Sequence, residues 1–130
     1  MNAMLAFPPK GVLNIHGALL PKYRGKFPSF WVLANGEEKT GVTVHYMNEA
    51  LDDGPIIVQR DVPITSEDTL HTLIRKSKIE YGAPALAEAL QRIAEDRVET
   101  QENDEAQATY FSFPTDEAIA AFRRSGRRVR

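Results

Sequence analysis

Asn14 and His16 end an apolar run and are the first candidates for chemistry. They lie two residues apart on an expected strand, so their side chains point to the same face. An amide and an imidazole at the carboxyl end of a strand could converge on one small group of a ligand. The alternative is a satisfied interior histidine beside a turn asparagine, because a single Asn-x-His pair is weakly specific.

Asp52 is the third candidate, in the acidic loop NEALDDGP between two expected strands. A carboxylate near an imidazole raises the pKa of the imidazole and allows proton relay. Asp53 is better explained as a solvated turn residue. His45, on the preceding strand, is expected to support the site rather than to catalyse directly. A zinc site built from His16, His45 and Asp52 has suitable ligand types but no supporting spacing, so we expect no metal.

The elements that must position these residues are short strands separated by loops. Apolar and β-branched residues predict the strands, and glycine with proline predicts the loops. The predicted segments are a strand over 11–16, a long loop over 17–30, one or two helical turns ending at Asn35 and Gly36, and strands over 40–47 and 55–64. The candidate residues therefore fall at or between strand ends.

The second half of the chain is predominantly helical by its periodicity. Apolar spacing predicts a long helix over 66–93, capped within Ser66, Glu67 and Asp68 and kinked at Gly82 and Pro84. A short strand over 108–113 and a helix ending at Gly126 follow. For the terminal RRSGRRVR, a frayed and solvated end is favoured over a phosphate-binding or RNA-binding tail.

Composition bounds the functional class. With 130 residues, 42% hydrophobic and 26% charged, the chain fits a soluble single domain. A net charge of -2 gives no general case for binding nucleic acid or a membrane surface. The absence of cysteine removes disulfides and thiolate sites and makes the cytoplasm the default location. No apolar stretch is long enough to cross a membrane.

Three strings carry a resemblance to a known family: NIHGALLPKYRG, then PSFWVLANGEEKTGVTVHYM, then LDDGPIIVQ. In this order and spacing they resemble the 10-formyltetrahydrofolate-dependent formyltransferases, which include glycinamide ribonucleotide, methionyl-tRNA and amino-sugar formyltransferases. The resemblance covers roughly positions 10 to 96. It implies formyl transfer from 10-formyltetrahydrofolate, as co-substrate, to an amine, and no metal.

The resemblance also implies a fold and a domain organisation. The expected class is α/β, a truncated Rossmann-like formyltransferase fold lacking its N-terminal βα units, because the family's catalytic domain normally begins upstream of the Asn-x-His strand. Residues 1–100 would form the C-terminal part of that domain, and 101–130 a polar linker, a short strand and a C-terminal helix. An exposed sheet edge would favour a homo-oligomer, and this chain alone could be inactive.

Carried over by position, the family's catalytic residues fall on Asn14, His16 and Asp52. The resemblance implies that the Asn14 amide and a protonated His16 stabilise the tetrahedral oxyanion. Asp52 would keep His16 charged and relay the proton from the amine to the leaving nitrogen. His45 matches a supporting histidine that is frequent in the glycinamide ribonucleotide and amino-sugar branches.

The folate is expected to contact the loop before the catalytic aspartate. The cofactor-binding residues implied by the resemblance are Met47, Asn48, Leu51 and Asp52. For the acceptor, an amino sugar or other small amine is favoured, and methionyl-tRNA, the one nucleic-acid partner expected, is second. The alternatives are a formyltetrahydrofolate deformylase, in which water is the acceptor, and a non-catalytic fragment of the same fold that binds folate or a partner.

Overall fold

The protein is described by a computed structural model over residues 10–49 and 52–130. Its main sheet contains three strands in the order β1-β3-β4, with both neighbouring pairs antiparallel. These strands are β1 (Leu13–His16), β3 (Lys39–Tyr46) and β4 (Ile56–Pro63). The predicted strands and the α/β class are thus confirmed, and no parallel strand pair of Rossmann type occurs in this sheet.

The two faces of β3 differ in character because successive side chains point to opposite sides of a strand. Val42 and Val44 lie in the hydrophobic core with Leu73. Thr43 and His45 point to the other face, and both are buried. The β-branched alternation of this strand therefore builds the core on one side and leaves polar groups for a site on the other.

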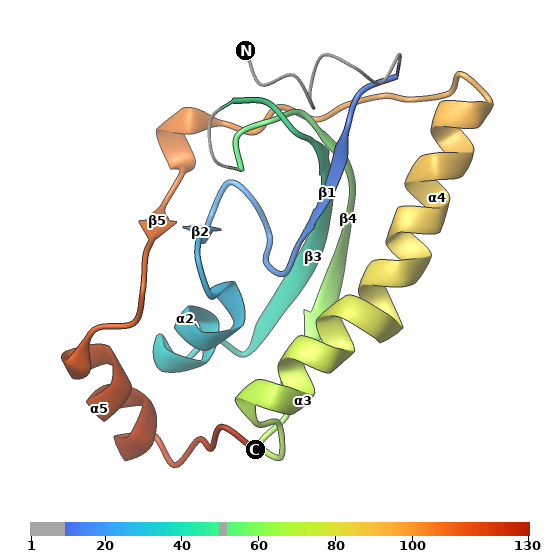
Figure 1. Cartoon of the computed structure of the whole chain (residues 1–130). Coiled ribbons are helices and arrows are strands. Elements are labelled where there is room, and N and C mark those ends of the chain that lie inside the picture. Colours follow the sequence, from blue (N-terminus) through green and yellow to red (C-terminus); the bar gives the residue numbers. More distant parts are fainter. Residues whose placement is uncertain (1–9, 50–51) are drawn as a thin grey trace.

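The predicted long helix is present as a helical arm of three consecutive parts (Figure 1). They are α3 (Leu70–Arg75), the π-helical turn η1 (Lys76–Gly82) and α4 (Ala83–Ala94). The irregularity falls in the turns before Pro84, which has no amide hydrogen to donate. The predicted N-cap was wrong, because Thr69 caps α3 by accepting a hydrogen bond from Thr72 N.

The remaining elements lie on the opposite side of the sheet from α4 (Figure 1). They are β2 (Arg24–Gly25), α2 (Pro28–Ala34), the single turn η2 (Glu105–Gln107), β5 (Tyr110–Phe111) and α5 (Asp116–Arg124). β2 and β5 pair in parallel. α5 packs on α2 through the stacked rings of Phe30 and Phe122, with centroids 5.2 Å apart.

The C-terminal segment is docked on the helical arm, so the expectation of a frayed terminus was wrong. The first amides of α3 have no acceptor within the helix. Leu70 N donates to Arg128 O at 2.9 Å, and His71 N donates to Val129 O at 2.8 Å. Arg127 adds hydrogen bonds to the carbonyls of Thr65 and Asp68. No helix of the described residues has the length and apolar character needed for a membrane span.

Candidate active site

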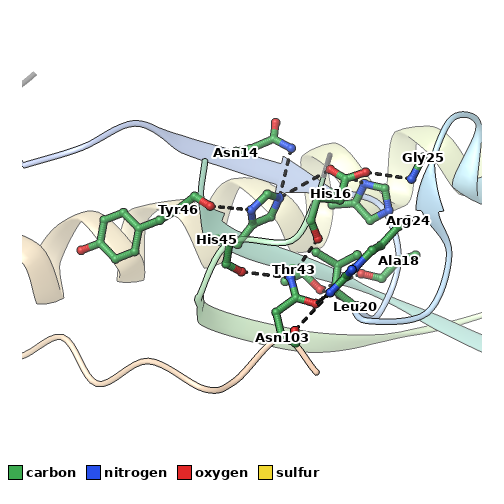
Figure 2. A network of polar contacts seen from close by, with 12 residues as sticks. Asn14, His16, Ala18, Leu20, Arg24, Gly25, Thr43, His45, Tyr46 and Asn103 are labelled. Carbon is green, nitrogen blue, oxygen red and sulfur yellow. Dashed lines mark hydrogen bonds and ion pairs between the residues drawn. The ribbon is translucent and has the colours of Figure 1, made fainter. Parts of the chain in front are cut away.

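The strand register brings the predicted site residues together. β1 pairs with β3 so that Asn14 lies opposite His45 and His16 lies opposite Thr43. Asp52 follows in the loop after β3, with its Oδ1 3.7 Å from both His16 Nδ1 and His45 Nε2. Figure 2 shows the side chains of Asn14 and His45 directed toward one another. His16, His45 and Asp52 are 6%, 2% and 7% exposed, so the cluster is screened from water.

The carboxylate of Asp52 is held by backbone geometry. Asp52 adopts a left-handed conformation with φ 56°, which is uncommon for a residue other than glycine. Gly25 N donates to its Oδ2 at 2.8 Å, leaving Oδ1 to face the two imidazoles. The loop thus aims one carboxylate oxygen at the histidines, while β2 fixes the other.

Hydrogen-bond partners define the protonation of His45. Its Nδ1 lies 2.9 Å from the carbonyl oxygen of Tyr46, which can only accept, so Nδ1 carries a hydrogen. Its Nε2 lies 3.2 Å from Asn14 Nδ2, an amide nitrogen that donates. A neutral His45 satisfies both contacts. It therefore holds the Asn14 amide in place.

His16 is positioned by the loop that follows it. Its Nε2 donates to Tyr23 O at 2.6 Å, so the Nδ1 lone pair of the neutral ring faces Asp52. Burial lowers the pKa of His16, and the opposing influence of Asp52 and of the Tyr23 carbonyl is weaker. In the free protein, desolvation of the imidazolium outweighs the attraction of Asp52, which argues against the expectation that Asp52 keeps His16 protonated.

Asp52 remains ionised in the same surroundings. Burial alone would raise the pKa of Asp52, but the neighbouring imidazoles of His45 and His16 and the Gly25 amide together lower it below its ordinary value. The site therefore combines a neutral histidine with a carboxylate at neutral pH. This pairing provides a base, His16 Nδ1, whose protonated form the adjacent charge would stabilise.

A buried network of hydrogen bonds around Thr43 holds the loop after His16. This network was not predicted from the sequence. Thr43 Oγ1 donates to Ala18 O at 2.7 Å and accepts from Leu20 N at 3.2 Å and from Gln59 Nε2 at 3.0 Å. Gln59 also donates to Leu20 O. Alternation along β3 places Thr43 on the same face as His45, and this was the signal in the sequence that could have predicted its role.

The expected folate-binding segment is only partly described. Met47 and Asn48 are exposed beside the site, and Leu51 lies outside the described residues. Asp53 was expected to be a solvated turn residue, which was wrong: it is half-buried, and its Oδ1 is buried without a hydrogen-bond partner among the described residues. Asp53 therefore offers an acceptor that a ligand N–H could satisfy.

No group of three or more His, Asp or Glu side chains in the described parts of the chain could hold a metal ion. His16, His45 and Asp52 have suitable ligand types and lie together. In this set His16 Nε2, His45 Nδ1 and Asp52 Oδ2 already have backbone partners.

Comparisons with known proteins agree with this geometry. The profile of the formyl transferase family matches residues 1–90. Over 109 residues the chain is 44% identical to methionyl-tRNA formyltransferase of Thermosynechococcus vestitus, covering 84% of this chain. The chain spans 32% of the length of that relative.

Solved structures of similar fold are also formyltransferases. One is the N-formyltransferase from Helicobacter canadensis in complex with folinic acid and dTDP-3-aminofucose: TM-score 0.73, 33% identity, 78% of this chain and 38% of that chain covered. Another is PseJ from Anoxybacillus kamchatkensis, in complex with a formamido-sugar nucleotide and tetrahydrofolate: TM-score 0.74, 26% identity, 86% of this chain and 58% of that chain covered. The predicted α/β formyltransferase fold is confirmed by these likenesses.

Proposed function

Because this chain belongs to the formyl transferase family, we propose that it supplies the catalytic residues for transfer of a formyl group from 10-formyltetrahydrofolate to an amine. The observation that carries the proposal is the cluster in which His16 and Asp52 lie 3.7 Å apart and Asn14 lies opposite His45 in the strand register. These residues come from segments far apart in the chain. Their amide, imidazole and carboxylate match the needs of acyl transfer to nitrogen.

The reaction forms one carbon–nitrogen bond and breaks another. The acceptor nitrogen attacks the formyl carbon to give a tetrahedral oxyanion, and the bond to N10 of the folate then breaks. A proton leaves the attacking amine and is delivered to N10, so a formamide and tetrahydrofolate result. The protein must therefore stabilise a transient negative oxygen and move one proton between two nitrogens.

His16 is suited to the proton transfer because it begins neutral. Its Nδ1 accepts the proton of the attacking amine, while Nε2–H stays bonded to the Tyr23 carbonyl. Asp52, 3.7 Å from Nδ1, stabilises the imidazolium as it forms. The same imidazolium then gives the proton to the leaving nitrogen. His16 is thus charged between the two transfers and neutral before them.

Asn14 is suited to stabilising the oxyanion. Its Nδ2 carries two hydrogens, and the contact with His45 uses one of them. The second can donate to the oxygen without loss of the contact that orients the amide. Removal of one oxyanion donor costs on the order of 10²- to 10³-fold in turnover in enzymes of this type. The same scale is expected for Asn14→Ala.

The folate would be bound along the segment before Asp52, by Met47, Asn48 and Leu51 as the resemblance implies. The buried Asp53 Oδ1, which lacks a partner among the described residues, fits a ligand that brings an N–H donor, and the pterin ring has such donors. Bound folate supplies the formyl group. Asp52 belongs to the same segment, so binding and proton relay would meet at this loop.

An amino sugar is the favoured acceptor. His45 orients Asn14 here, and the family resemblance places a histidine at this position in the amino-sugar branch. The solved structure from Helicobacter canadensis, 33% identical, contains dTDP-3-aminofucose. Methionyl-tRNA is the second candidate, because the 44% identical relative is a methionyl-tRNA formyltransferase. A deformylase, with water as acceptor, is third.

Turnover of 10-formyltetrahydrofolate by the full-length protein tests the proposal. The protein is assayed with dTDP-3-aminofucose, with methionyl-tRNA and with neither, and formyl transfer is followed by mass spectrometry. Asn14→Ala, His16→Ala and Asp52→Ala should each slow transfer strongly, whereas His71→Ala, at an exposed histidine of α3, should not. Absence of transfer to either amine and to water would leave a non-catalytic folate-binding protein.

A further inference from the structure

A segment downstream of the site runs beside the loop that carries Asp52. Gln101 exchanges backbone hydrogen bonds with Ile56, at 2.8 and 3.0 Å, and Arg24 N donates to Thr109 O at 2.8 Å. The parallel pairing of β2 with β5 continues this contact. Residues 101–111 lie beyond the part of the chain that the family profile matches, residues 1–90. They nevertheless border the candidate catalytic loop.

Asn103 joins this segment to Asp52. Its Nδ2 donates to Asp52 O at 2.8 Å and to Gly54 O at 2.9 Å. Its Oδ1 accepts from Arg24 Nη2 at 2.7 Å. A guanidinium only donates, so the atom facing Arg24 must be the amide oxygen, and the nitrogen must face the two carbonyls. Arg24 therefore determines which way the Asn103 amide is oriented.

Arg24 is itself fully buried, which is rare for a charged side chain. Besides Asn103, its guanidinium contacts the Glu105 carboxylate and donates to Tyr110 Oη at 2.7 Å. A buried cation is unfavourable unless it is paired and hydrogen-bonded. The partners all come from residues 103–110, so these residues both neutralise Arg24 and keep it in place (Figure 2 shows Arg24 beside Asn103).

We propose that Arg24 and Asn103 are positioning residues for Asp52. Asn103 holds the backbone carbonyls of Asp52 and Gly54, and this keeps Asp52 in the left-handed conformation that points its carboxylate at His16. Arg24 acts one step further away, by orienting the Asn103 amide. The inference rests on the proposed function for its effect on turnover. Neither residue needs to touch the substrate.

The effect on turnover is tested in the full-length protein with Asn103→Ala, compared with Gln107→Ala, an exposed amide of the same segment. Loss of a partner behind a reacting group typically costs about 10- to 100-fold in activity. We expect a fall of that size in kcat with KM unchanged for Asn103→Ala, and no change for Gln107→Ala. In an Asp52→Ala background Asn103→Ala should have no further effect, because it acts through Asp52.

The pKa of His16, measured by NMR, separates positioning from a general structural role. Asp52 raises this pKa in the native site, so Asn103→Ala should lower it further as the carboxylate moves away. If Asn103→Ala does not fold, Asn103→Leu serves instead, since it keeps the size of the side chain, loses the donor and adds no charge. An unchanged His16 pKa and unchanged kcat in a folded variant would overturn the inference. An inactive wild type would overturn the proposed function alone, because the NMR comparison needs no turnover.

Discussion

His16 Nδ1 and Asp52 Oδ1 lie 3.7 Å apart, and both side chains are almost completely buried. The pKa values of both residues lie below their ordinary values. Burial lowers that of His16, whereas hydrogen bonds and neighbouring imidazoles lower that of Asp52 against the effect of burial. The pair therefore exists at neutral pH as an imidazole beside a carboxylate.

These shifts predict how stability depends on pH. A group whose folded pKa lies below its unfolded pKa binds fewer protons in the native state, so stability is full above the unfolded value and falls as pH decreases. His16 should contribute a loss of stability that begins as the pH falls to about 6.5, and Asp52 a loss that begins near pH 3.8. Denaturant titrations across pH should show that His16→Gln removes the first decrease. A wild type equally stable at pH 7 and 5 would contradict this.

Activity should follow the same ionisation of His16. The acidic limb of the kcat/KM profile reports protonation of the base in the free enzyme. Because the pKa of His16 is lowered, the neutral base and the activity should persist below pH 6.5. Asp52→Asn removes the influence that raises the pKa, so the limb should move to still lower pH while turnover falls. A pH–rate series with both proteins measures this. A limb above 6.5 in the wild type would contradict a lowered pKa of His16.

The hydroxyl of Thr43 should be important for stability. It is fully buried and is shared by Ala18 O, Leu20 N and Gln59 Nε2. Thr43→Val keeps the shape of the side chain but leaves Ala18 O and Leu20 N without a partner, at about 1–3 kcal/mol for each buried group left unsatisfied, whereas Gln59 Nε2 keeps Leu20 O. We expect a loss of about 2–6 kcal/mol in the free energy of unfolding. Thr100→Val, at an exposed position, is the matched control and should change little.

The grouping of Asn14, His16 and Asp52 could be predicted from the sequence, because strand spacing and motif order agree with the resemblance to the formyltransferases. Spacing of two on a strand places Asn14 and His16 on one face, and the motif order adds Asp52. Arg24 and Asn103 had no such signal, since their contact spans 79 positions of sequence. The protonation of His16 was missed because it depends on the balance of burial and charge, which no local pattern contains.

Helix ends show the same limit on a smaller scale. The sequence places several capping residues before α3, and composition alone favoured Ser66, Glu67 and Asp68. The structure selects Thr69, because its side chain accepts from Thr72 N while Thr72 bonds back to Thr69 N. The Asp68 carboxylate instead accepts hydrogen bonds from Thr65 N and from Lys76 Nζ. Capping propensity thus predicted where the helix begins to within a few residues. Which residue forms the cap is decided by contacts in the folded chain.

Thr69→Ala should consequently destabilise the protein more than Ser66→Ala does. Loss of an N-cap side chain costs about 1 kcal/mol, and Thr69 is buried, so water cannot easily replace its hydroxyl. Ser66 is exposed and lies four positions before Leu70, the first residue of α3. Thermal unfolding of the two variants measures the difference. Equal effects would show that the capping box contributes nothing measurable.

Two glycines with positive φ provide a matched test of how β2 holds Asp52. Gly25 has φ 105°, and an added Cβ would lie 2.0 Å from Phe111 O, whereas Gly36 has φ 74° with nothing within 4 Å. Gly36→Ala should cost only the conformational strain, about 1–2 kcal/mol. Gly25→Ala must also push β2 away from β5 and withdraw the amide that binds Asp52 Oδ2. Unfolding assays should therefore show a larger loss of stability for Gly25→Ala than for Gly36→Ala, and turnover assays should show a loss of activity only for Gly25→Ala. Equal losses of stability and activity in the two variants would mean that the β2–β5 contact does not position the carboxylate.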